Sequence, residues 1–174
     1  AIPALEQMAA ESDRPLARLH ALCTLDGLDA LSSQLLTHAL EDNHPAIRRH
    51  AVRLAESRGA DEPAIRRNVM DLVHDPSAKV RLQLACTLGE WPEAETGQAL
   101  GRLAVSDAED PFLSAAIISS INRQNIDLVL KVVRAERSDA FTGALVGRLL
   151  ALSVALGNRE AVLDALNRLV QPEK

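Results

Sequence analysis

The stretch DNHPAIRRHAV at residues 42–52 returns 33 residues later as DPSAKVRLQLA at residues 75–85. Six residues separate the first aspartate from the arginine in both copies, and an aliphatic residue directly precedes Arg48 and Arg81. A fixed period of this length is typical of an array of similar units, each of which buries its apolar face against its neighbours. The sequence therefore predicts a repeat protein rather than a chain folded around one central core.

The position of these arginines, called here the marker position, recurs along the chain in steps of 30, 33 and 33 residues. It is occupied in turn by Arg18, Arg48, Arg81 and Ser114. A proline stands three residues before the marker in most copies, and proline suits the first turn of a helix because its missing N–H is not needed there. Acidic residues that favour helix N-termini lie upstream of each marker: Asp13, Asp42, Asp75, and Asp107 or Asp110. Each marker thus predicts the start of the second helix of a helical pair.

Apolar residues fall one position before each marker and three, four and seven positions after it, which is the periodicity of a buried helical face. Aromatic residues make up only 2% of the chain, and leucine and alanine supply most of a 47% hydrophobic content, so strands are disfavoured. We expect an all-α fold, an α-solenoid of about five helical pairs with 30–33 residues per repeat. The expected intervening helices cover residues 3–10, 28–40, 62–73, 94–105 and 126–136, followed by helices at 139–156 and 160–169. Residues 1–174 are expected to form a single domain excised from a longer protein.

Composition also argues against several functions. The net charge is −5 and is spread over both halves of the chain, so no basic half is present to attract nucleic acid. No apolar run approaches the roughly 20 residues of a membrane span, so direct membrane insertion is not expected. Gly97 and Gly101 are not followed by a phosphate-loop pattern, and the histidines and the two cysteines, Cys23 and Cys86, lack the spacing of a metal site. We therefore predict no catalytic residues, no metal and no cofactor in this domain.

The pattern D-x-x-x-x-[IV]-R at residues 42–48 and 75–81, with a small residue downstream, resembles the HEAT repeat. The period is shorter than the usual 40–47 residues, which is similar to the compact HEAT-like class that includes bilin-lyase-type repeats. The resemblance covers residues 13 to about 121. It implies a structural ladder in which an aspartate of one repeat pairs with the arginine of the next, such as Asp42 with Arg81.

A narrower resemblance rests on the runs RPLARLHAL (14–22), IRRHAVRLAE (47–56), VRLQLACTLGE (80–90) and AAIISS (115–120). They are similar to the HEAT-like segment of bacterial, exported membrane-bound dehydrogenases of the sorbosone type. Those proteins also carry a propeller-type domain and a c-type haem domain with the motif C-x-x-C-H. Neither cysteine here belongs to such a motif, so the resemblance implies the helical middle of an exported or periplasmic redox protein, without its haem.

Two groups of residues invite a functional interpretation. Arg18, Arg48 and Arg81 could form a basic ridge for an acidic partner, but we favour the structural ladder with Asp42 and Asp75. The only basic cluster comprises Arg49, Arg53, Arg66 and Arg67, which could be a solvated face or a docking site for an acidic surface. Trp91, which precedes Pro92 at a repeat boundary, could anchor an interface or cover the end of a repeat core.

The leading hypothesis from the sequence is a non-catalytic scaffold, a protein-interaction module whose partners are neighbouring domains of the parent chain or another protein. The alternative is a HEAT-like enzyme or enzyme subunit, of the bilin-lyase or DNA-glycosylase kind. A DNA glycosylase would need a basic concave face and aromatic side chains to hold a base, and this chain has three aromatic residues in all.

Overall fold

The computed structural model describes residues 1–135, 141–158 and 163. Its contacts divide the chain into two compact units, Ala1–Thr87 (unit 1) and Leu88–Lys174 (unit 2), and each is described by itself. The division falls within a helix. The single domain expected over residues 1–174 stays a prediction.

Regular structure in the described residues consists of ten α-helices and one short 3-10 helix, with no β-strand. Unit 1 contains α1 (Ile2–Glu11), α2 (Pro15–Gly27), α3 (Ser33–Leu40), α4 (Pro45–Ala55), α5 (Pro63–Met70), the 3-10 helix η1 (Asp71–His74) and most of α6 (Ala78–Glu90). Unit 2 contains α7 (Thr96–Ser106), α8 (Pro111–Ser120), α9 (Ile126–Ala135) and α10 (Phe141–Ala155). The predicted all-α fold is confirmed.

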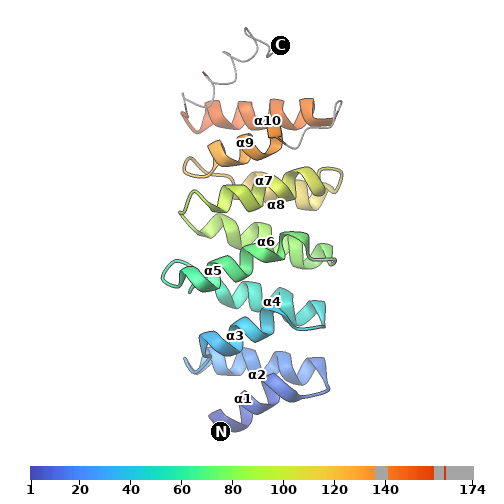
Figure 1. The fold of residues 1–174 in the computed structure, drawn as a ribbon, viewed down its shortest axis with the longest axis vertical. Helices are drawn as coiled ribbons and strands as arrows, with labels where there is room; N and C mark the ends of the chain where they lie inside the picture. Colours follow the sequence, from blue (N-terminus) through green and yellow to red (C-terminus); the bar gives the residue numbers. More distant parts are fainter. Residues whose placement is uncertain (136–140, 159–162, 164–174) are drawn as a thin grey trace. The chain divides into compact units, whose positions relative to one another are not determined.

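Helices that follow one another in the sequence pack together. Within unit 1, α1 contacts α2 and α3 contacts α4, so consecutive helices form pairs (Figure 1). The second helices α2 and α4 also contact each other, and the first helix α3 contacts both α1 and α5. In unit 2, α7 contacts α8 and α9, and α9 contacts α10. Each pair therefore packs on the next in the manner of a helical repeat.

The predicted apolar register of the second helices is confirmed by burial. All the positions one before and three, four and seven after each marker are buried except Ala17 and Ile118, which are half-buried. The buried set is Ala21, Leu22, Leu25, Ile47, Ala51, Val52, Ala55, Val80, Leu84, Ala85, Leu88, Leu113, Ile117 and Ile121. Small and aliphatic side chains at these positions allow neighbouring helices to pack closely.

Several predicted helix ends were wrong. The helix expected from residue 28 begins at Ser33, because the chain turns through Asp29 at a positive φ of 52° and the Ser32 hydroxyl then accepts a hydrogen bond from the Leu35 amide at 3.2 Å. The helix expected over residues 62–73 stops at Met70 and tightens into η1. The helix expected at residues 160–169 lies almost entirely outside the described residues.

Candidate functional site

The arginines at the marker position join consecutive repeats of unit 1. Arg18 donates from Nε and Nη2 to the two carboxylate oxygens of Asp42, at 2.7 and 2.9 Å. Arg48 makes the same bidentate contact with Asp75, at 2.6 and 2.9 Å. Paired N–H donors of a guanidinium match the two oxygens of a carboxylate, and such charge-assisted hydrogen bonds are short and strong. These two pairs form the Arg–Asp ladder of unit 1.

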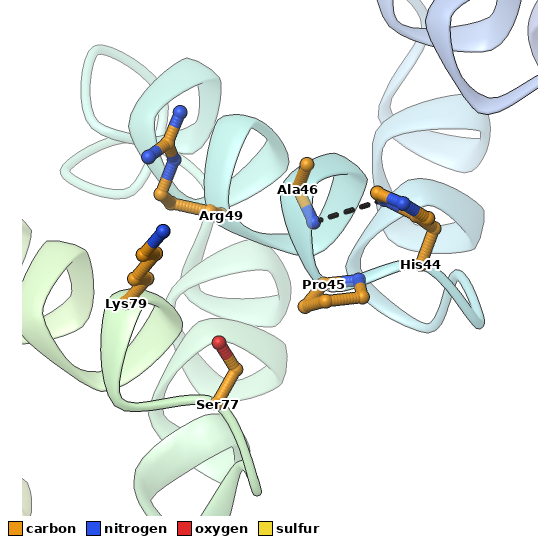
Figure 2. A pocket seen from close by; sticks show the side chains of 6 residues that line it. All are labelled: His44, Pro45, Ala46, Arg49, Ser77 and Lys79. Atoms are coloured by element: carbon orange, nitrogen blue, oxygen red, sulfur yellow. Dashed lines mark hydrogen bonds between the residues drawn. The ribbon is translucent and has the colours of Figure 1, made fainter.

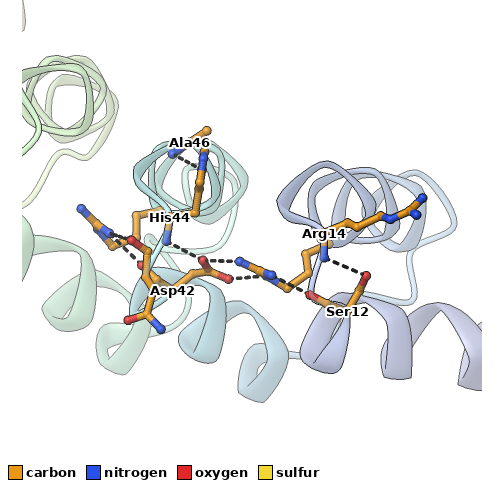
Figure 3. Close-up of polar contacts among 8 residues, drawn as sticks. Ser12, Arg14, Asp42, His44 and Ala46 are labelled. Atoms are coloured by element: carbon orange, nitrogen blue, oxygen red, sulfur yellow. Dashed lines mark hydrogen bonds and ion pairs between the residues drawn. The ribbon is translucent and has the colours of Figure 1, made fainter.

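The same guanidinium also holds the loop of its own repeat. Arg18 Nη1 donates to the Ser12 carbonyl oxygen at 2.6 Å, six residues upstream (Figure 3). Arg48 donates to the Asp42 carbonyl at 2.7 Å and Arg81 to the Asp75 carbonyl at 2.6 Å, at the same spacing of six residues. Each marker arginine therefore fixes the turn before its own helix while the first two also bind the next repeat.

Each ladder aspartate fixes a turn as well. Asp42 accepts a hydrogen bond from the His44 amide at 2.7 Å (Figure 3), and Asp75 accepts one from the Ser77 amide at 2.8 Å. Their carboxylates thus hold the backbone two residues ahead rather than capping the helix in the way predicted. A helix cap of the predicted kind occurs in unit 2, where Asp110 accepts from the Phe112 and Leu113 amides.

The expected pairing of Asp42 with Arg81 is wrong: an arginine binds the aspartate of the next repeat, not of the previous one. The reason is the Nη1 contact, because a guanidinium tied to the carbonyl of its own preceding loop presents its other edge to the following repeat. Arg81 keeps that first contact.

The side chains of the Arg–Asp ladder are largely buried, and the pKa values of all four are shifted. The side chains of Asp42 and Asp75 are 8% and 1% exposed, and their arginine partners 14% and 13%. Burial raises the pKa of Asp75, but hydrogen bonds from Arg48 and the Ser77 amide outweigh it and hold that pKa below its ordinary value. The same opposition of burial against the Arg18 and His44 hydrogen bonds lowers the pKa of Asp42. Hydrogen bonding to the aspartates raises the pKa of both arginines.

Beside the ladder, a pocket of about 430 Å³ lies at the start of α2 and α4. Its lining is largely apolar and includes Leu16, Leu19 and Ile47. Leu16 is 68% exposed and Leu19 is half-buried, whereas Leu22 and Leu25 of the same helix are fully buried. We call this the apolar pocket.

A second pocket of about 340 Å³ lies one repeat further on, at the start of α4 and α6 (Figure 2). It is lined by His44, Pro45, Ala46, Arg49, Ser77 and Lys79. Figure 2 shows the Lys79 side chain, from one helix, extending towards the Arg49 side chain of the other. No carboxylate lines this pocket, which we call the basic pocket.

The two pockets are equivalent in the repeat. In one repeat, both pockets are lined by the residues four, three and two positions before the marker and by the residue directly after it. In the next repeat, both are lined by the residues four and two positions before the marker. They also share two lining residues, His44 and Ala46, so they adjoin. Sequence reasoning identified the register but missed the pockets, although a leucine at position 16, outside the predicted buried register, was a signal that could have found the first.

The predicted interaction surface is divided by the structure. Arg49 lines the basic pocket, and Arg53 and Arg67 are exposed. Arg66 is only 8% exposed and donates to the Gly59 carbonyl oxygen, so it serves the loop after α4 rather than a partner. Trp91 is 1% exposed, which favours the core-covering role over that of an interface anchor. Cys23 is half-buried, Cys86 is exposed, and no disulfide joins them.

His50 follows Arg49 in α4 and is half-buried. Its Nε2 is 3.0 Å from Arg49 Nη2, and its buried Nδ1 has no hydrogen-bond partner. Burial, and then the charges of Arg49 and Arg53, lower the pKa of His50. A neutral imidazole whose proton is on Nδ1 accepts from Arg49 through Nε2, and in this tautomer His50 holds one edge of that guanidinium.

No cluster of three or more histidine, cysteine, aspartate or glutamate side chains that could hold a metal ion occurs among the residues that the structure describes. None of the described helices is long and apolar enough to cross a membrane.

Comparison of the chain with protein-family models, with curated proteins and with solved structures found no match. The class of protein is therefore defined by the fold alone: an all-α protein in which neighbouring helices pack in a repeating arrangement.

Proposed function

We propose that the chain is a non-catalytic protein-interaction module, and that unit 1 binds its partner along the N-terminal ends of α2, α4 and α6. The observation that carries this proposal is the pair of adjoining, equivalent pockets with different linings. Surfaces repeated at a fixed period are the usual binding faces of helical repeat proteins. The different side chains at equivalent positions would supply specificity.

The Arg–Asp ladder supports the proposal because it fixes the loops that border the pockets. The Asp42 carboxylate holds both Arg18 and the amide of His44, a residue that lines both pockets. A surface that is already ordered loses little conformational entropy when it binds, which leaves more of the contact energy available for affinity. In this proposal the ladder has a structural role and the neighbouring pockets bind.

From the resemblance to exported sorbosone-type dehydrogenases, we further propose that the partner is a neighbouring domain of such a parent chain or a protein exported with it. The module itself would then bind no cofactor. The four sequence runs at residues 14–22, 47–56, 80–90 and 115–120 support this part of the proposal.

Site-specific photocrosslinking in cells that express the full-length protein tests the proposed function. A photoreactive amino acid replaces Leu16 or Lys79, and in matched controls it replaces Gln34 or Arg67, which are exposed on α3 and α5 of the same unit. The expected result is one partner sequence, identified by mass spectrometry, that is crosslinked from both pocket positions and from neither control position. Equal labelling from all four positions, or none from the pocket positions, would overturn the proposal.

A further inference from the structure

Building on the proposed function, we propose that the two pockets of unit 1 bind an extended, acidic peptide segment that places an aliphatic side chain in the apolar pocket and a carboxylate in the basic pocket. The juxtaposition that carries this inference is Leu16 and Leu19 in one pocket and Arg49 and Lys79 in the next. Because the pockets share His44 and Ala46, one continuous ligand can reach both.

The two cations of the basic pocket lack acidic partners. Among the described residues neither Arg49 nor Lys79 forms an ion pair. Arg49 contacts His50, whose lowered pKa favours the neutral imidazole. Asp42 and Asp75, the aspartates six residues before the markers of these two repeats, are already held by Arg18 and Arg48. Two like charges that face one pocket repel each other, and a bound carboxylate would relieve that repulsion.

The apolar pocket determines which class of anion fits. An exposed leucine beside a second leucine and Ile47 gains from burial against an aliphatic side chain. Nucleic acid would offer phosphates to the basic pocket but only bases or sugars to the apolar one, whose lining contains no aromatic side chain for base stacking. The chain also carries a net charge of −5, which disfavours a polyanion overall. These observations favour a peptide over nucleic acid.

Helix spacing sets the spacing of the two ligand side chains. Packed helices lie about 8–10 Å apart. A segment in the polyproline II conformation rises about 3.1 Å per residue and returns to the same face every third residue, so side chains three positions apart are about 9 Å apart. The expected recognition sequence therefore has leucine or isoleucine and glutamate or aspartate three residues apart, in one of the two chain directions.

Fluorescence anisotropy with the full chain tests this. Labelled proline-rich peptides carry Leu-x-x-Glu or Glu-x-x-Leu, and the controls replace leucine by serine or glutamate by lysine. One of the two directions is expected to bind with a Kd in the micromolar range, and each peptide control is expected to weaken binding about tenfold. Equal binding of the serine control, or tighter binding of duplex DNA of matched charge, would overturn the inference.

Charge reversal in the protein supplies the matched comparison. Lys79→Glu is expected to weaken the acidic peptide about tenfold and to bind the lysine peptide instead, whereas Arg67→Glu, an exposed cation outside both pockets, is expected to change affinity less than about twofold. If Arg67→Glu weakens binding as much as Lys79→Glu, the attraction is non-specific and the inference is wrong. If crosslinks from Leu16 and Lys79 identify a partner but no peptide of this class binds, the interaction module stands and only the proposed ligand chemistry fails.

Discussion

Unit 1 and unit 2 bring consecutive helical pairs together by different means. In unit 1 the bidentate contacts of Arg18 with Asp42 and of Arg48 with Asp75 join one repeat to the next. In unit 2 the marker position carries Ser114, and α7 packs on α9 at Gly97 and Gly101, where any side chain would meet the other helix. The helical repeat thus continues in unit 2 although Ser114 replaces the marker arginine. It does so because the apolar positions around the marker stay buried, and close helix packing takes the place of the Arg–Asp contact.

The loop between α8 and α9 gives unit 2 a polar substitute of its own. Asn125 is fully buried, and its side chain accepts from the Asn122 amide at 2.9 Å and donates to the Ser120 carbonyl at 3.2 Å. Asn122 in turn accepts from the Asn125 amide at 3.1 Å. Neutral amides therefore hold this turn, in contrast to the charged pairs that hold the turns of unit 1, and the two units should respond differently to mutation and to pH.

The largest effect is expected for Gly97→Ala in unit 2. A Cβ at this position would clash with the Asn125 carbonyl oxygen and lie 2.9 Å from Leu128 Cβ, and backbone cannot move aside as a flexible side chain can. Overpacking of this kind costs about 3 kcal/mol of unfolding free energy. Urea denaturation followed by circular dichroism measures the loss, and hydrogen exchange should locate it in α7 and α9.

Gly147→Ala is the matched control for that substitution. Gly147 lies on α10 with open space around its Cα, so alanine should stabilise the helix by up to about 1 kcal/mol. If the two variants behaved alike, the close approach of α7 and α9 would not be what holds unit 2 together.

The second largest effect is expected for Asp75→Ala in unit 1, at about 2 kcal/mol. This change removes the partner of Arg48 and the acceptor of the Ser77 amide from a site where the aspartate is 1% exposed. Asp71→Ala, an exposed aspartate of η1, should change the unfolding free energy by less than about 0.5 kcal/mol. A double-mutant cycle with Arg48→Met measures how much of the loss belongs to the ion pair.

A smaller effect is expected from acid, and it should be confined largely to unit 1. The pKa of His50 is lowered from 6.5, so the unfolded chain takes up the proton first, and stability should fall as the pH drops below 6.5 towards the folded pKa. The pKa values of Asp42 and Asp75 are lowered from 3.8, so their stabilisation is complete above that pH and is lost as the pH falls through their folded values.

Urea midpoints at pH 7.5, 5.5 and 3 separate these two steps. His50→Gln should remove the first step, and Asp75→Ala should reduce the second. His20→Gln, at an exposed position of α2, serves as the control. If His20→Gln removed the first step and His50→Gln did not, that loss of stability would belong to His20, and the prediction for His50 would be wrong.

The smallest effect is expected for Ser114→Ala, which changes the marker position of unit 2. The Ser114 hydroxyl accepts one long hydrogen bond, 3.3 Å, from exposed Arg148. Its removal should cost less than about 0.5 kcal/mol, whereas Arg48→Ala at the equivalent position of unit 1 should cost several times more. Thermal unfolding of both variants gives the comparison directly, and equal losses would contradict the difference drawn between the units.

Much of the fold could be predicted from the sequence because its signals are local. The 33-residue period, the prolines at helix starts and the apolar residues around Ile47 and Val80 depend only on helical geometry, so the helices and their buried faces followed from them. The resemblance of residues 42–48 and 75–81 to the HEAT repeat implied that Arg18, Arg48, Asp42 and Asp75 join the repeats, but it gave the pairing in the wrong direction.

Only the tertiary structure decided how those residues are used. Which repeat a guanidinium reaches depends on the loop carbonyl that holds its other edge, and that is a contact between segments, not a property of the sequence pattern. Burial likewise encloses Arg66 and Trp91, which the sequence offered as candidates for an interaction surface, and leaves Leu16 exposed beside a pocket. The sequence alone determined the repeating helices and their buried side; the packing of one repeat on the next determined which polar side chains are enclosed and where the pockets lie, because side-chain reach and exposure depend on neighbours far away in the chain.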